Sequence, residues 1–264
     1  MSTARSNEPI VDRAYGPIIT FTRFGFMSLR LKLMITGSEH IPATGGAVLA
    51  ANHTGYMDFT FIGAAARERG RLVRFLCKKE IFDHPLGGPV MRSMHHVSVD
   101  REAGTASFSQ SLRLLKAGEL IGIFPEGTVS RSFEPIEFHS GATALAAASN
   151  VPLIPIAIWG SQRVWTKARK PAFPSHRTPI MVAVGEPMFF ERREDHDAAT
   201  ERVRERIAET LTALQVAYPD QPRNNNDRWW VPARLGGTAP TPEEAAELEI
   251  QRRAEKQARK QAKD

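Results

Sequence analysis

Short apolar runs alternate with amphipathic segments along most of the chain. Short runs bounded by Gly, Pro or Asn indicate buried strands, and apolar positions three and four apart indicate helices. The predicted strands cover residues 47–52, 72–77, 96–99, 120–124, 153–159 and 180–184. The predicted helices cover residues 58–69, 106–117, 141–148 and 200–217. This alternation predicts an α/β fold, a single layered domain with a mostly parallel central sheet flanked by helices.

The N-terminal part differs from this pattern. Residues 10–34 predict an amphipathic helix. Its apolar face either packs on the α/β core, as is usual for such helices, or lies at a membrane surface without spanning it, which is the hypothesis we pursue. The apolar side chains expected to enter the lipid are those of Phe21, Phe24 and Phe26. The basic side chains expected to meet anionic headgroups are those of Arg23, Arg30 and Lys32.

The C-terminal part is polar. It contains the pair Trp229–Trp230, which we expect to be exposed, and a highly charged helix that begins at Thr241. We therefore divide the chain into an N-terminal interfacial helical segment (1–36), an α/β domain (37–220), and a polar linker with a charged C-terminal tail (221–264).

Composition narrows the functional classes. The chain has 264 residues, 42% of them hydrophobic, which is enough for a sizeable core. Its formal net charge of +6 suits partners that carry phosphate, such as anionic lipids or coenzyme A. No recognisable nucleic-acid-binding module accompanies this charge, so we expect no nucleic acid partner. The single cysteine, Cys77, excludes an internal disulfide and is expected to be a buried small hydrophobe.

Positive charge is concentrated in two stretches. Residues 67–79 contain six Lys or Arg side chains and one acid, Glu68. Residues 160–177 contain five such side chains and no acid. Runs of this kind usually form a solvated face, and this is our expectation for each of them.

No membrane-spanning helix is expected, because no uncharged apolar stretch reaches the length of about 18 residues that a span requires. We expect no cleavable leader either, since the first residues are polar and no apolar core with the usual flanks follows them.

The most informative motif is His53-Thr-Gly-Tyr-Met-Asp58. It follows a predicted buried strand and precedes a predicted helix, so the histidine and the aspartate can fold back on each other. A carboxylate that binds one imidazole nitrogen leaves the other nitrogen free to accept a proton. The motif contains no serine or cysteine nucleophile, and we therefore interpret His53 as a base that activates a hydroxyl of the substrate. Taken alone, such a pair is more often structural than catalytic.

A second motif follows the predicted strand 120–124. Its sequence, Phe124-Pro-Glu-Gly-Thr-Val-Ser-Arg131, combines features suited to an anion. Gly127 allows close approach of the backbone, the hydroxyl groups donate hydrogen bonds, and Arg131 provides a guanidinium. An ordinary strand-to-loop turn is the alternative interpretation. Because the carboxyl ends of parallel strands share one edge of a sheet, we expect both motifs in one site.

Together with two weaker blocks, these motifs resemble the glycerophospholipid acyltransferase family, the lysophosphatidate acyltransferases of the PlsC type. The four ordered blocks are Asn52-His53 with Asp58, Asp100-Arg101 after a short strand, Phe124-Pro-Glu-Gly-Thr128, and Val151-Pro-Leu-Ile-Pro155. The resemblance covers about residues 35 to 190. The first and third blocks are specific, and the other two are weak alone.

The resemblance implies an O-acyltransferase of phospholipid biosynthesis, bound peripherally at the cytoplasmic face of the cell membrane. It would transfer an acyl chain from acyl-CoA or acyl carrier protein to the hydroxyl of lysophosphatidate, with His53 as base, Asp58 orienting it, and no metal or other cofactor. The residues implied in substrate and phosphate binding are Lys78, Lys79, Arg101, Glu126, Gly127, Thr128 and Arg131.

Two departures from the family pattern concern the acceptor. Val129 occupies the position where many relatives have arginine, and Met94-His-His-Val replaces the usual residues before Asp100. Another lysolipid or a glycolipid therefore remains an alternative acceptor. A lipid hydrolase that uses the same His53–Asp58 pair is the alternative from a different class, and a non-catalytic lipid-binding module is disfavoured because both residues are present.

Overall fold

The computed structural model describes residues 15–100, 104–172 and 177–261. The strands are β1 (Leu31–Thr36), β2 (Ala47–Ala51), β3 (Val73–Lys78), β4 (Val97–Val99), β5 (Leu120–Ile123), β6 (Leu153–Trp159) and β7 (Thr178–Val184). The α-helices are α1 (Tyr15–Ser28), α2 (Asp58–Glu68), α3 (Lys79–Asp83), α4 (Gly87–Ser93), α5 (Gly104–Lys116), α6 (Gly141–Ser149), α7 (His196–Val216) and α8 (Pro242–Gln261). Short 3₁₀ helices are η1 (Ser38–His40), η2 (Ser161–Arg163), η3 (Asn225–Trp230) and η4 (Ala233–Leu235).

The strands form a seven-stranded sheet in the order β1-β7-β6-β2-β5-β3-β4. The five strands from β6 to β4 are parallel, whereas β7 is antiparallel to β6 and β1 is parallel to β7. All six predicted strands are present, and the mostly parallel α/β architecture is confirmed. Parallel strands place their carboxyl ends at one edge of the sheet, which positions the loops after β2, β3, β4 and β5 beside one another.

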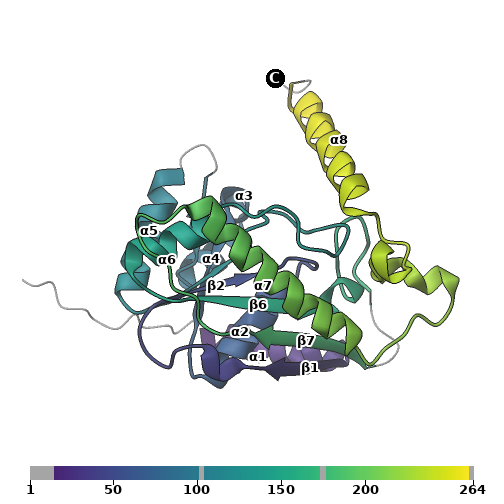
Figure 1. Cartoon of the computed structure of the whole chain (residues 1–264), viewed down its shortest axis with the longest axis horizontal. Coiled ribbons are helices and arrows are strands. Elements are labelled where there is room, and N and C mark those ends of the chain that lie inside the picture. Colours follow the sequence, from purple (N-terminus) through teal and green to yellow (C-terminus); the bar gives the residue numbers. More distant parts are fainter. Residues whose placement is uncertain (1–14, 101–103, 173–176, 262–264) are drawn as a thin grey trace, which may run out of the picture.

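Helices cover both faces of the sheet (Figure 1). The alternation along β2 shows the two faces, because Leu49 packs in a core with α2 and Val48 packs in a core with α6 and α7. Every residue of β2 is fully buried. Continuous apolar sequence is what a central strand covered on both faces requires.

The N-terminal prediction needs a correction. Residues 31–34, expected to end a helix, instead start strand β1, which pairs with β7. The left-handed backbone of Arg30 (φ 52°) separates this strand from α1. The last six residues of the proposed N-terminal segment therefore belong to the sheet. A short, partly exposed edge strand of mixed polarity is easily taken for the continuation of an amphipathic helix.

Helix α1 buries one side and exposes the other. Phe26 stacks on Phe61 of α2, with ring centroids 5.1 Å apart. It therefore packs on the core, whereas we expected it to enter the lipid. Phe21, Phe24 and Met27 are 77%, 62% and 73% exposed. Within the described parts of the chain, no helix has both the length and the apolarity needed to cross a membrane.

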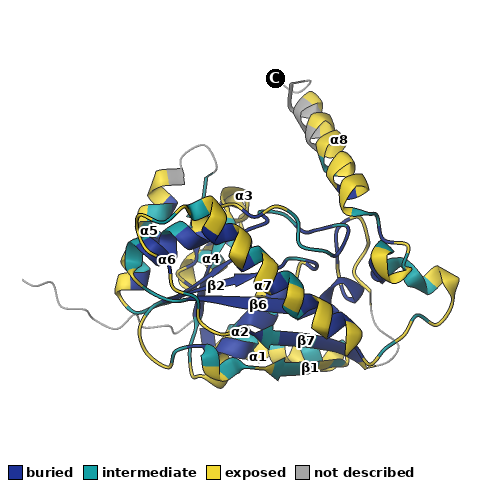
Figure 2. Cartoon of the chain, viewed as in Figure 1, coloured by how far each residue is buried: buried dark blue, intermediate teal, exposed yellow. Residues whose placement is uncertain are grey.

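The region after residue 220 packs partly on the α/β body. Trp230 is buried against Tyr218, with ring centroids 5.6 Å apart, so the expectation of an exposed tryptophan pair is wrong for this residue. Helix α8 begins with a capping box, in which Thr241 and Glu244 exchange backbone-to-side-chain hydrogen bonds. It projects from the body, and its described side chains are mostly exposed (Figures 1 and 2).

Candidate functional site

Both motifs lie at the carboxyl edge of the sheet, as expected. His53 follows β2 and Glu126 follows β5, and these two strands are adjacent and parallel. The imidazole of His53 stacks on the ring of Phe124, with centroids 4.0 Å apart. Ser130 also donates its backbone N–H to the carbonyl oxygen of His53 at 2.7 Å. The fold thus brings the two motifs into direct contact.

His53 and Asp58 form a hydrogen-bonded pair. Asp58 Oδ2 lies 2.9 Å from His53 Nδ1 and also accepts the backbone N–H groups of Thr54 and Gly55, at 2.8 and 2.9 Å. Asp58 is fully buried at the N-terminus of α2, where the helix dipole favours a negative charge. A carboxylate held in this way accepts the Nδ1 proton, so Nε2 of His53 is the nitrogen available as a base.

The turn between these residues is held by the loop that follows β6. Thr166 donates its hydroxyl to the Thr54 carbonyl oxygen at 2.6 Å, and Tyr56 donates its backbone N–H to the Trp165 carbonyl oxygen at 2.9 Å. A Cβ added to Gly55 would lie 3.0 Å from the backbone of Ser161, so glycine is required by close packing. These contacts come from residues 161–166, which sequence reasoning did not assign to the site.

Glu126 lies beneath His53 and is only 4% exposed. Its Oε1 accepts the backbone N–H of His53 at 2.7 Å, and its Oε2 accepts that of Ile136 at 3.5 Å. Burial raises the pKa of Glu126 to about 8, partly offset by these two hydrogen bonds. The carboxyl group therefore faces the backbone of the site, which differs from the substrate contact expected from the sequence.

The remaining residues of the second motif surround this position. Gly127 has a φ of 63°, in the left-handed region, and its N–H donates to the Phe124 carbonyl oxygen. The Thr128 hydroxyl accepts a hydrogen bond from Lys167 at 2.7 Å. Arg131 is half-buried, and its Nε has no hydrogen-bond partner within the described part of the chain. A buried guanidinium N–H without an acceptor is suited to an anion.

The other predicted binding residues are more dispersed. Lys78 is exposed at the end of β3, next to β5. Lys79 starts α3 and forms an ion pair with Asp83 at 2.6 Å, and the hydrogen bond from this pair raises the pKa of Lys79. Arg101 lies outside the described residues.

In the part of the chain that the structure describes, neither a reactive thiol nor a cluster of metal ligands accompanies these groups. Cys77 is partly buried in β3, and burial raises its pKa to about 11, which disfavours the reactive thiolate. Over residues 15–100, 104–172 and 177–261, no three His, Cys, Asp or Glu side chains gather as a metal site requires.

Similarity to known proteins agrees with this geometry. A family model described as acyltransferase matches residues 32–159. The 1-acyl-sn-glycerol-3-phosphate acyltransferase of Bacillus subtilis is 30% identical over 195 residues, which cover 71% of this chain and 92% of that protein. This chain belongs to the PlsC-type acyltransferase family.

Other members of the family are similar over a shorter part of their length. The 1-acyl-sn-glycerol-3-phosphate acyltransferase of Limnanthes douglasii is 31% identical over 156 residues, covering 58% of this chain and 53% of that protein. The crystal structure of PlsC, the LPA acyltransferase of Thermotoga maritima, superposes with a TM-score of 0.64 at 22% identity and covers 78% of this chain and 81% of its own. This structure has the same fold.

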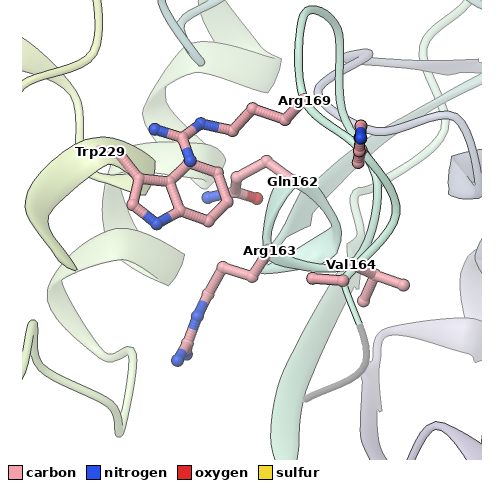
Figure 3. A pocket seen from close by; sticks show the side chains of 7 residues that line it. Gln162, Arg163, Val164, Arg169 and Trp229 are labelled. Atoms are coloured by element: carbon pink, nitrogen blue, oxygen red, sulfur yellow. The ribbon is translucent and has the colours of Figure 1, made fainter.

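The family match ends at Trp159. The residues that follow it form a loop that packs against the C-terminal region. A cavity of 240 Å³ lies between the loop after β6 and η3 (Figure 3). Arg169 stacks on the Trp229 ring at 3.9 Å, and the buried Arg163 pairs with Asp220 at 2.5 Å. These contacts join the loop to the C-terminal region. With Lys167, whose ammonium pairs with Glu249, three of the five cations expected to be solvated have structural partners.

Proposed function

We propose that this acyltransferase transfers a fatty acyl chain from an acyl thioester, acyl-CoA or acyl carrier protein, to the free hydroxyl of lysophosphatidate and forms phosphatidate. The observation that carries the proposal is the His53–Asp58 pair, 2.9 Å apart at the edge where the family motifs meet. The Bacillus subtilis relative is a 1-acyl-sn-glycerol-3-phosphate acyltransferase, which supports this choice of acceptor.

In the proposed reaction His53 acts as a general base. Its Nε2 removes the proton of the acceptor hydroxyl while the hydroxyl oxygen attacks the thioester carbonyl carbon. The tetrahedral oxyanion that forms then collapses, the carbon–sulfur bond breaks, and the thiolate takes the proton back from the imidazolium. Asp58 stabilises the imidazolium and keeps Nε2 directed outward. The proposed transfer is direct, and the Cys77 thiol is an unfavourable acyl carrier because burial raises its pKa to about 11.

The acceptor phosphate would bind the cationic residues around the second motif. Thr128 and Arg131 lie next to the segment that contacts His53, and Lys78 reaches the same edge from β3. Arg101 and Lys79 remain further candidates, as implied by the family pattern. Gly127 would allow backbone approach, and Glu126 would hold the backbone of His53 in position.

Membrane association would be peripheral and mediated by α1. The helix presents Phe21, Phe24 and Met27 to solvent at intervals of three residues, which places them on one face. Arg23 and Arg30 are exposed beside this face and could contact anionic headgroups. With the enzyme held in this way at the cytoplasmic face of the cell membrane, a two-tailed product could leave the site directly into the lipid.

An acceptor panel tests the proposal. Purified protein is incubated with oleoyl-CoA and with lysophosphatidate, glycerol 3-phosphate or a lysoglycolipid, and products are resolved by mass spectrometry. Phosphatidate formation that depends on lysophosphatidate and falls about 10²- to 10⁴-fold in His53→Ala is the expected result. Preferential acylation of the lysoglycolipid would show that the acceptor is a glycolipid and not lysophosphatidate. Release of free fatty acid without any acceptor would favour a hydrolase. Activity that survives EDTA is expected for metal-free chemistry.

A further inference from the structure

Lys167 is buried although it lies in a cationic stretch expected to face solvent. Its side chain is 4% exposed. The ammonium group donates one hydrogen bond to Thr128 Oγ1 at 2.7 Å and another to Glu249 Oε2 at 2.6 Å. A buried ammonium requires both hydrogen bonds and an opposite charge. Here the opposite charge comes from α8, a helix outside the part of the chain that the family model matches.

Two short connections place Lys167 beside the His53 turn. The preceding residue, Thr166, donates its hydroxyl to the carbonyl oxygen of Thr54, which follows His53. Thr128, the other partner of Lys167, is two residues from Ser130, whose backbone N–H binds the carbonyl oxygen of His53 at 2.7 Å. The ammonium is therefore held by the segments that also hold the proposed base.

A second cation lies near the same position. Burial lowers the pKa of Lys167, Glu249 opposes this effect, and the neighbouring charges of Arg252 and Arg131 add to the lowering. Arg131 Nε is buried and has no hydrogen-bond acceptor among the described residues. Lys167, Thr128 and Arg131 thus offer an ammonium, a hydroxyl and a guanidinium to an anion, and the carboxylate of Glu249 already contacts the ammonium.

We propose that Lys167, with Thr128 and Arg131, binds the phosphate of the acyl acceptor, and that Glu249 competes with this phosphate for Lys167. The inference rests on the proposed function and adds a binding residue and an internal competitor to it. A phosphomonoester carries a charge of about −1.5 to −2 at pH 7 and three acceptor oxygens, so it can replace a single carboxylate. In the absence of acceptor, Glu249 keeps the buried ammonium compensated.

The position of α8 is consistent with such an exchange. The helix projects from the α/β body, and its described side chains are largely exposed (Figure 2). Ala245, one turn before Glu249, is buried, so the start of the helix is anchored while the segment with Glu249 reaches the site. In the proposed exchange only the side chain of Glu249 moves, and α8 otherwise stays in place.

Substitution of the two partners distinguishes the proposal from a purely structural ion pair. Lys167→Met should raise the KM for lysophosphatidate about 10- to 100-fold, because a charge-assisted contact is lost, and leave the KM for acyl-CoA nearly unchanged. Glu249→Gln should lower the KM for lysophosphatidate by about three- to tenfold, because the competing charge is removed. Lys167→Arg should retain part of the affinity. Lys170→Met, an exposed lysine of the same loop, is the matched control and should change neither constant.

A binding measurement separates this inference from the proposed function. Isothermal titration calorimetry measures the binding of a short-chain lysophosphatidate and of the corresponding uncharged monoacylglycerol to each protein. Only the phosphorylated ligand should bind more weakly to Lys167→Met and more tightly to Glu249→Gln. Loss of affinity in both variants, or unchanged affinity in Lys167→Met, would overturn the role of Lys167. Absence of acyl transfer by the unsubstituted protein would instead refute the proposed function, and the binding result would still decide the role of Lys167.

Discussion

Glu126 Oε1 accepts the backbone N–H of His53 at 2.7 Å, and this bond joins the two most specific motifs of the chain. The contact spans 73 positions of sequence and is partly buried, with Glu126 only 4% exposed. This bond fixes the backbone of His53, while the bond from Asp58 Oδ2 to His53 Nδ1 fixes the imidazole ring. The proposed base is therefore positioned by two carboxyl groups with different tasks.

Asp58→Asn should reduce the turnover number about 10²-fold or more with little change in KM. The amide lacks the charge that stabilises the imidazolium, and its NH₂ group can present a donor to His53 Nδ1. Steady-state kinetics with lysophosphatidate and acyl-CoA measure the effect. Asp197→Asn, an exposed aspartate in the first turn of α7, is the control and should retain full turnover. Full activity in a folded Asp58→Asn variant would contradict the mechanism.

Glu126→Gln should change how stability depends on pH. Because the pKa of Glu126 in the folded protein, about 8, is above its ordinary value of 4.5, the folded state binds more protons within this window. The associated stability is present below pH 4.5 and is lost as the pH rises towards 8. The glutamine variant lacks this loss, so its stability relative to the original protein should rise by at least about 1 kcal/mol between pH 5 and pH 8. Urea unfolding at both pH values measures it, and a pH-independent difference would contradict the prediction.

His96→Asn should have the opposite pH signature. His96 Nδ1 accepts the backbone N–H of Phe75 at 3.1 Å, which requires a neutral ring. Burial, together with the charges of Arg74 and His95, lowers its pKa from 6.5 to about 4. The stability it contributes is therefore present above pH 6.5 and is lost as the pH falls towards 4. Asparagine can accept the same hydrogen bond without titrating, so acid unfolding should begin at lower pH. Circular dichroism between pH 7 and pH 3.5 records the midpoint, and an unchanged midpoint would refute this role.

Replacement of Phe21, Phe24 and Met27 by Ser should weaken binding to anionic liposomes by about 10- to 100-fold, since three exposed apolar side chains are removed. A flotation assay with phosphatidylglycerol vesicles measures the effect. Deletion of residues 1–34 is less suitable, because it would remove part of β1.

Two controls accompany this experiment. Phe189→Ser changes a phenylalanine that is 72% exposed outside α1 and should leave liposome binding intact. Phe26→Ser should lower the melting temperature, since Phe26 stacks on Phe61. If the triple variant floats with the vesicles as well as the original protein does, α1 is not the membrane contact.

Local pattern was sufficient for much of the architecture. The apolar strand β2 is buried on both faces, and its sequence predicts this directly. His53 and Asp58 could be paired from sequence because they are five positions apart in one turn, and few backbone conformations lie between them. Helix α7 was found as well, although its start is four residues earlier than predicted, because the Asp195 side chain caps the backbone N–H groups of Asp197 and Ala198.

The tertiary structure decided every feature that depends on a distant partner. Strand β1 exists because β7 pairs with it, and Phe26 is covered because α2 lies beside it. The burial of Lys167 depends on Thr128 and Glu249, which lie 39 and 82 positions away. A charged or apolar pattern indicates which side chains favour water and which favour burial. The element that covers a given side chain, however, is determined by packing over the whole fold. For this reason the sequence alone indicated the acyltransferase family and the candidate base, whereas the surroundings of that base were determined only by the folded chain.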